Sequence, residues 1–201
     1  MFRIRCDQTA NGVIDMILFH VSEEANIQIF HPRTPTRTDL NPEIPLVWAL
    51  DEKRLPNFLT PRNCPRVTYH AGEQTTETDR MRFFSNPDVP HVVAIENAWF
   101  ETMKHTTLYL YAFDSADFVL QDPIAGYYVS EKTQIPLSVT PCRDLFEELF
   151  RRNVEVRLLK NLWPLVDAVQ ASTLNWSFCR MKNAQNRVVP AATPFCFDSS
   201  T

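Results

Sequence analysis

Glycine is scarce in this chain: only 3 of the 201 residues are glycine, against 15 prolines. A Rossmann fingerprint and a phosphate-binding P-loop each need several glycines, because the backbone must approach the phosphates closely. The sequence therefore excludes both motifs. Any nucleotide bound here would be held by side chains and ordinary loops.

Long apolar runs and an excess of basic residues are missing as well. No stretch of about 18 apolar residues occurs, so we expect no transmembrane helix. Residues 1–11 lack the apolar core of a secretory signal. The net charge is −4, whereas nucleic-acid-binding domains usually carry a basic face. We expect a cytoplasmic protein with neither a membrane nor a nucleic acid as partner.

The cysteine and histidine patterns typical of metal sites are also absent. Five cysteines are scattered along the sequence, their number is odd, and no C-x-x-C pair occurs. A disulfide framework and a structural zinc site are both disfavoured. The five histidines show no H-x-x-x-H or H-E-x-x-H spacing. We expect reduced thiols and no bound metal.

The pattern of apolar residues predicts many short strands and few helices. A length of 201 residues, 44% of them hydrophobic, suits one domain. Alternating or fully apolar runs predict strands at 12–21, 46–50, 66–70, 91–95, 107–113, 118–120, 126–129, 135–139 and 154–159. Helical patterns with capping residues predict helices at 51–58, 75–84, 97–103, 143–153 and 162–171.

The predicted strands cluster in the middle of the chain with little helix between them. This order differs from the regular alternation of a doubly wound fold. We expect a single α+β domain over residues 1–183, with a bent, mostly antiparallel sheet and short flanking helices. Residues 184–201 are small and polar with two prolines, and predict a flexible or surface-draped tail.

A few polar residues stand out against this background. His20 ends the apolar run 16–20, where it can present its ring to a cleft or serve as a structural histidine. Arg33 and Arg62 each follow a proline in a short loop, which restricts the backbone beside a bidentate anion donor. Both arginines also fit an ordinary surface position. Asp122 precedes Pro123 and fits an Asp-Pro turn equally well.

Several segments together resemble a family of uncharacterised proteins. They are Phe19-His-Val-Ser-Glu-Glu24, Phe30-His-Pro-Arg33, Val47-Trp-Ala-Leu-Asp51, Pro61-Arg-Asn-Cys-Pro-Arg-Val67 and Gly126-Tyr-Tyr-Val-Ser-Glu131. The resemblance runs from about residue 17 to residue 183. The family is known only as a domain of unknown function, so it implies no activity.

The order of elements also resembles the ADP-ribosyltransferase fold of the small rifampin-modifying type. Those enzymes open their NAD site with Phe-His-Gly-Thr, which Phe19-His-Val-Ser22 resembles with valine and serine in the last two places. Their next motif is an aromatic residue on a strand before a helix, and Trp48 matches it. Their Phe-Glu-Asp-Asp-Pro loop is similar to the segment ending at Asp122-Pro123. Their Tyr-Arg-Thr-x-Glu-Pro-Leu strand pair is similar to Tyr128 through Leu137.

This resemblance implies a role for each matching residue. His20 would bond the nicotinamide-side ribose or amide, and Trp48 would stack on the nicotinamide. Asp122, or Glu131 nearby, would stabilise the oxocarbenium-like centre as nicotinamide leaves. Arg33 would neutralise the pyrophosphate. The binding surface expected from this comparison also includes Ser22, Arg62 and Tyr128.

The resemblance thus implies NAD-dependent ADP-ribosyl transfer or NAD hydrolysis, with NAD as substrate and no metal. The acceptor and the oligomeric state stay open. One alternative is a non-catalytic module that binds a nucleotide or another small ligand in the same cleft. Another is a different small-molecule enzyme that uses His20 as general base with an acidic residue.

Overall fold

The computed structural model describes residues 16–35 and 40–187. Within them the chain forms ten strands, four α-helices and four short 3-10 helices. The strands are β1 (Ile17–Ser22), β2 (Val47–Leu50), β3 (Arg66–His70), β4 (His91–Glu96), β5 (Leu108–Asp114), β6 (Val119–Asp122), β7 (Tyr127–Ser130), β8 (Ser138–Cys142), β9 (Val154–Leu159) and β10 (Asn175–Cys179). The helices are η1 (Leu55–Phe58), α1 (Glu77–Phe83), η2 (Asn97–Trp99), α2 (Phe100–His105), η3 (Ser115–Asp117), α3 (Leu145–Arg151), α4 (Trp163–Gln170) and η4 (Met181–Asn183).

The strands form two sheets. The large sheet has the order β6-β7-β2-β1-β5-β8, and the small sheet has the order β10-β3-β4-β9. All pairs are antiparallel except β4–β9, which is parallel. The predicted α+β class with mostly antiparallel strands is confirmed, but the strands divide between two sheets where the sequence had predicted one bent sheet.

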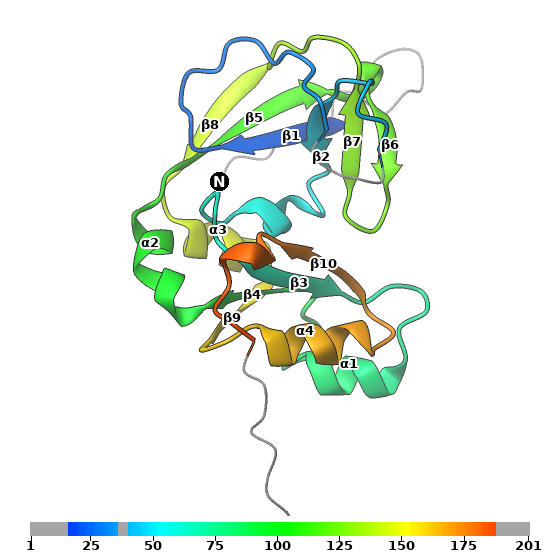
Figure 1. Cartoon of the computed structure of the whole chain (residues 1–201), viewed down its shortest axis with the longest axis vertical. Coiled ribbons are helices and arrows are strands. Elements are labelled where there is room, and N and C mark those ends of the chain that lie inside the picture. Colours follow the sequence, from blue (N-terminus) through cyan, green and yellow to red (C-terminus); the bar gives the residue numbers. More distant parts are fainter. Residues whose placement is uncertain (1–15, 36–39, 188–201) are drawn as a thin grey trace, which may run out of the picture.

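Three apolar clusters hold the layers together. The first lies between the sheets and joins Leu50 and Leu110 of the large sheet to Val93 of the small one. The second lies under the small sheet, where Val67 and Tyr69 pack against α4 and the end of α1. The third covers the outer face of the large sheet around Phe30 and Phe113. Figure 1 shows the large sheet above the small one, with α1 and α4 on the far side of the small sheet.

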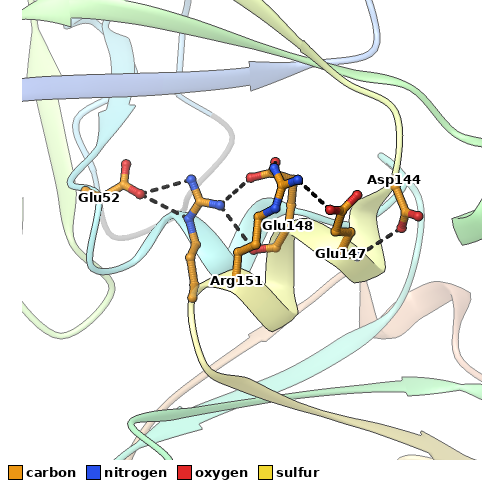
Figure 2. A network of polar contacts seen from close by, with 6 residues as sticks. Glu52, Asp144, Glu147, Glu148 and Arg151 are labelled. Carbon is orange, nitrogen blue, oxygen red and sulfur yellow. Dashed lines mark hydrogen bonds and ion pairs between the residues drawn. The ribbon is translucent and has the colours of Figure 1, made fainter. Parts of the chain in front are cut away.

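Helix α3 joins the two sheets through charged side chains. Arg152, just after the helix, donates to Glu52 at 3.0 Å and also to Glu148. Arg151 pairs with Glu147 and Glu148 one turn back, and Asp144 caps the helix by accepting the N–H of Glu147 at 2.9 Å (Figure 2). Glu52 follows β2, so this network ties the helix to the large sheet.

Two predicted elements differ from the structure, and one strand was not predicted. The helix expected at 51–58 is only the 3-10 turn η1, because Asp51 accepts the N–H of Arg54 at 2.7 Å and Pro56 has no N–H to donate. The strand expected at 135–139 begins instead at Ser138, since Gln134 forms a bridge with Phe30 and Ile135 remains 69% exposed. Strand β10 had not been predicted.

The C-terminal segment has ordered contacts beyond the predicted boundary at residue 183. The N–H of Gln185 donates to both carboxylate oxygens of Glu96 at 3.0 and 3.1 Å. Arg187 pairs with Asp167 at 2.7 Å and lies over the ring of Trp163. The rest of the predicted tail, residues 188–201, lies outside the described residues. No helix in the described ranges is long and apolar enough to cross a membrane.

Candidate functional site

The site is built on the second half of β1. Because side chains alternate along a strand, Leu18, His20 and Ser22 share one face of the large sheet. Leu18 belongs to the outer apolar cluster, whereas Phe19 and Val21 pack into the cluster between the sheets. His20 therefore lies on the outer face.

A backbone carbonyl on the neighbouring strand fixes the ring of His20. Its Nδ1–H donates to the carbonyl oxygen of Trp48 across 2.9 Å. A carbonyl can only accept, so the neutral ring carries its proton on Nδ1 and its lone pair on Nε2. The ring also contacts Phe30, with centroids 4.9 Å apart. Nε2 has no hydrogen bond within the described residues and is not among their buried unpartnered atoms, so solvent or a ligand can reach it.

Two arginines set the electrostatics around this ring. Burial lowers the pKa of His20, and the positive charges of Arg33 and Arg62 lower it further, against the opposing effect of the Trp48 carbonyl. The imidazole is therefore neutral at pH 7. The two guanidinium groups are exposed, and neither forms an ion pair within the described residues.

Both arginines stand on anchored backbone. Arg33 exchanges two backbone hydrogen bonds with Leu46, at 3.1 and 2.9 Å, which extends the edge of β2. The N–H of Arg62 donates to the carboxylate of Glu23 at 2.8 Å. The loops around the arginines are thus held while their side chains remain free to meet an anion.

Of the other predicted residues, Tyr128 and Ser22 lie on the same outer face. Tyr128 pairs with Ala49 and packs with the outer cluster. Burial raises the pKa of Tyr128, and the nearby negative charge of Asp51 adds to this effect. The hydroxyl of Ser22 accepts the N–H of Glu24 at 3.1 Å, which closes the turn after β1.

The structure does not bring Trp48 to the ring of His20. Val47 and Ala49 point to the outer cluster, so the side chain of Trp48 between them points to the opposite face. There it meets Tyr127 edge to face, with ring centroids 5.2 Å apart. The only link between Trp48 and His20 in the described contacts is through the backbone carbonyl.

The two predicted acids lie away from β1 or in solvent. Asp122 pairs with Tyr127 on β7, and β6 stands three strand positions from β1, roughly 14 Å at the usual strand spacing. Its carboxylate accepts the N–H groups of Ile124 and Ala125, both at 3.0 Å, and so forms the turn between β6 and β7. Glu131 follows β7 and is exposed.

A shallow pocket of about 430 Å³ opens beside Arg62. Its lining is polar and aromatic, and consists of Glu23, Pro61, Asn63, Trp99, Thr102, Thr106 and Thr107. Glu23 is not among the site residues predicted from the sequence. Its position three residues after His20, within the same motif, was the available signal.

The described residues contain no group of three or more histidine, cysteine or acidic side chains arranged to hold a metal ion. Around His20 the chain offers one neutral imidazole and two cations, and the carboxylate of Glu23 lies beside Arg62. Such a set suits an anionic organic ligand.

Comparison with known families agrees with the motifs. Residues 19–184 of this chain, which include the motifs on β1, β2 and β7, match the model of a family of unknown function, DUF6886. The match covers most of the 201 residues, and the chain belongs to this family. Neither the curated proteins nor the solved structures gave a match.

Proposed function

We propose that this protein binds a phosphate-bearing small molecule at His20, Arg33 and Arg62, with NAD as the first candidate. The observation that carries the proposal is the neutral imidazole flanked by two exposed guanidinium groups that have no ion-pair partner in the described chain. Unpaired cations on anchored loops are the usual means of recognising phosphate by side chains.

The chemistry of each group fits a nucleotide. A guanidinium can bond two phosphate oxygens at once, and a pyrophosphate offers enough oxygens for both arginines. The lone pair on Nε2 of His20 can accept a ribose hydroxyl. Tyr128, on the same face, offers a ring edge or face for a base. This arrangement needs no glycine-rich loop, in keeping with three glycines in the chain.

NAD-dependent ADP-ribosyl transfer is the second candidate, supported by the resemblance of Phe19-His-Val-Ser22 to the motif that opens the NAD site of the rifampin-modifying enzymes. β1, which carries His20, lies in the interior of the large sheet between β2 and β5. In the reaction the bond between the ribose C1′ and the nicotinamide nitrogen breaks, nicotinamide keeps the bonding pair, and an acceptor hydroxyl, amine or water bonds C1′ and loses a proton.

This second candidate needs a carboxylate near the ribose. Both carboxylates accept backbone N–H groups, but Asp122 stands three strands from β1, whereas Glu23 follows His20 by three residues and lines the pocket next to Arg62. We therefore assign the charge-stabilising role in any turnover to Glu23. Trp48 takes no part in binding under this proposal, because its ring lies on the other face of the sheet.

Calorimetric titration with NAD, ADP-ribose and inorganic pyrophosphate tests the binding. We expect Arg33→Gln and Arg62→Gln each to weaken ADP-ribose binding by roughly tenfold or more, the usual worth of a charge-assisted hydrogen bond. Arg82→Gln on α1 is the matched control, because α1 lies on the far side of the small sheet. Absence of binding by the wild-type protein, or equal binding by all three variants, would overturn the proposal.

Release of nicotinamide from NAD, followed by chromatography, separates turnover from binding. If the second candidate holds, wild-type protein releases nicotinamide and Glu23→Gln loses the release while still binding ADP-ribose. Binding without release by the wild-type protein would identify a binding module and remove the transferase.

A further inference from the structure

A second concave surface lies on the opposite flank of the small sheet from α4. It is an apolar groove of about 500 Å³ between α2, α3 and the outer strand β9. Its lining residues are Phe100, Lys104, Asp144, Phe146, Phe150, Val156 and Leu158. We call this surface the phenylalanine groove.

Large apolar side chains of the phenylalanine groove are exposed to solvent. The rings of Phe100 and Phe146 lie 5.4 Å apart, and Phe150 stacks on Phe146 at 6.3 Å. Phe150 is nevertheless 61% exposed and Leu158 is 43% exposed. A contiguous aromatic surface of this kind is typical of a contact site for another apolar segment.

The described chain ends beside the last residues of the edge strand β9, with Arg187 paired to Asp167 on the α4 side of the small sheet. Glu96, which holds the N–H of Gln185, pairs with Leu159 at the end of β9. The side-chain amide of Asn161 donates to the carbonyl of Asn186 at 2.9 Å. The chain thus passes residue 186 next to the end of β9, whose Val156 and Leu158 line the groove.

The residues that follow contain a suitable occupant. Phe195, Cys196 and Phe197 form a short apolar segment that carries the only aromatic side chains after Phe178 in the sequence. The seven residues 188–194 that precede it can span about 24 Å when extended. From Arg187 the segment must pass around the edge strand β9 to reach Leu158, and 24 Å exceeds the roughly 10 Å between packed layers. In an extended segment the two phenylalanine side chains would point to the same side.

We propose that the phenylalanine groove is the docking surface for residues Phe195–Phe197 of the same chain. The two rings lie against Phe146 and Phe150, where aromatic pairs add to the gain from burying apolar surface. The segment shields the outer strand β9, which would otherwise offer an open sheet edge. This inference is independent of ligand binding at His20.

Disulfide trapping in the full-length protein tests this docking, because Cys196 supplies one thiol. Lys104→Cys and Leu158→Cys each place a second thiol in the groove, and Met81→Cys, on α1 at a position 70% exposed, is the control. After mild oxidation, peptide mapping identifies the pairs formed. We expect a disulfide within one chain between Cys196 and either groove thiol, in yields at least about fivefold above the Met81→Cys control.

The double change Phe195→Ser and Phe197→Ser, made in the Lys104→Cys background, should reduce the yield to that of the control. The proposal is overturned by equal yields for groove and control positions, by disulfides that join two chains and so place a second copy in the groove, or by a yield that the serine changes leave intact.

Discussion

The stacked pair His70 and His91 leads to a prediction about acid stability. The two ring centroids lie 5.7 Å apart, on the neighbouring strands β3 and β4, and the residues are 4% and 3% exposed. Nε2 of His70 and both ring nitrogens of His91 have no hydrogen-bond partner among residues 16–35 and 40–187. Burial lowers the pKa of each ring to about 3, and the charge of Arg54 adds to the effect on both. Neither ring takes up a proton easily while the chain is folded.

The sign of the effect follows from the direction of these pKa shifts. Above pH 6.5 both rings are neutral in the folded and the unfolded chain, so they contribute no pH dependence. Between about pH 6.5 and pH 3 both histidines are protonated in the unfolded chain but remain neutral in the folded chain. Each histidine then lowers the free energy of unfolding by about 1.4 kcal/mol per pH unit. Between pH 6.5 and 4.5 the two histidines together lower the free energy of unfolding by about 5 kcal/mol. This is a large share of the roughly 5–15 kcal/mol by which a typical domain is stable.

The substitution His91→Leu should remove about half of this acid sensitivity. Leucine has a similar volume and no buried nitrogen to satisfy, so we expect stability at pH 7.5 to be kept or increased. Chemical unfolding at pH 7.5, 6.0, 5.0 and 4.5 gives the slope of the unfolding free energy against pH for each variant. The control is His105→Gln on α2, whose side chain is 73% exposed and stays in water in both states. Equal slopes for wild-type protein and His91→Leu would refute the reasoning.

Three further changes test other parts of the fold. The buried guanidinium of Arg66 donates to two backbone carbonyls, one of them on Cys64 at 3.1 Å. Arg66→Met removes these donors and should lower the unfolding free energy, measured by denaturant titration, by about 3 kcal/mol. A loss below about 1 kcal/mol would contradict the assigned contacts. Gly126→Ala places a Cβ 2.4 Å from Cγ of Arg54, on a residue whose φ is +67°. We expect the free energy of unfolding to fall by about 2–3 kcal/mol, which a lower melting temperature would show. An unchanged melting curve would show that the hairpin accommodates the methyl group. Burial raises the pKa of the Cys64 thiol to about 12. Iodoacetamide at pH 8 should therefore leave Cys64 unmodified while the half-buried Cys179 reacts. Peptide mapping that finds Cys64 alkylated in the folded protein would refute its burial.

Much of the strand pattern could be predicted from the sequence because the spacing of apolar residues shows which side chains are buried. β3, β4, β5 and β9 are apolar or alternating runs bounded by turns, and each lies close to its predicted place. β10 was missed although Trp176 and Phe178 alternate with Asn, Ser and Cys, because the run has only five residues. Its partner β3 lies about a hundred residues earlier in the chain, and that pairing leaves no local signal.

The candidate site was only partly predictable for a related reason. Alternation along β1 places His20 and Ser22 on one face, and alternation along β2 places Trp48 opposite to its neighbours. Whether these faces coincide depends on the register between the strands, here the pairing of Phe19 with Leu50. That register is set by tertiary packing. The transferase resemblance gave the order of the motif residues but could not give the direction of the Trp48 ring.

The parallel pairing of β4 with β9 has a consequence for how this molecule folds. Between these strands the chain leaves the small sheet, builds β5 to β8 of the large sheet, and returns through α3. Each sheet is therefore assembled from two separate stretches of sequence, and no single cut divides the chain into one sheet and the other. Contacts between residues so distant in sequence slow the search for the native state. We expect the two layers to form and to melt as one cooperative unit.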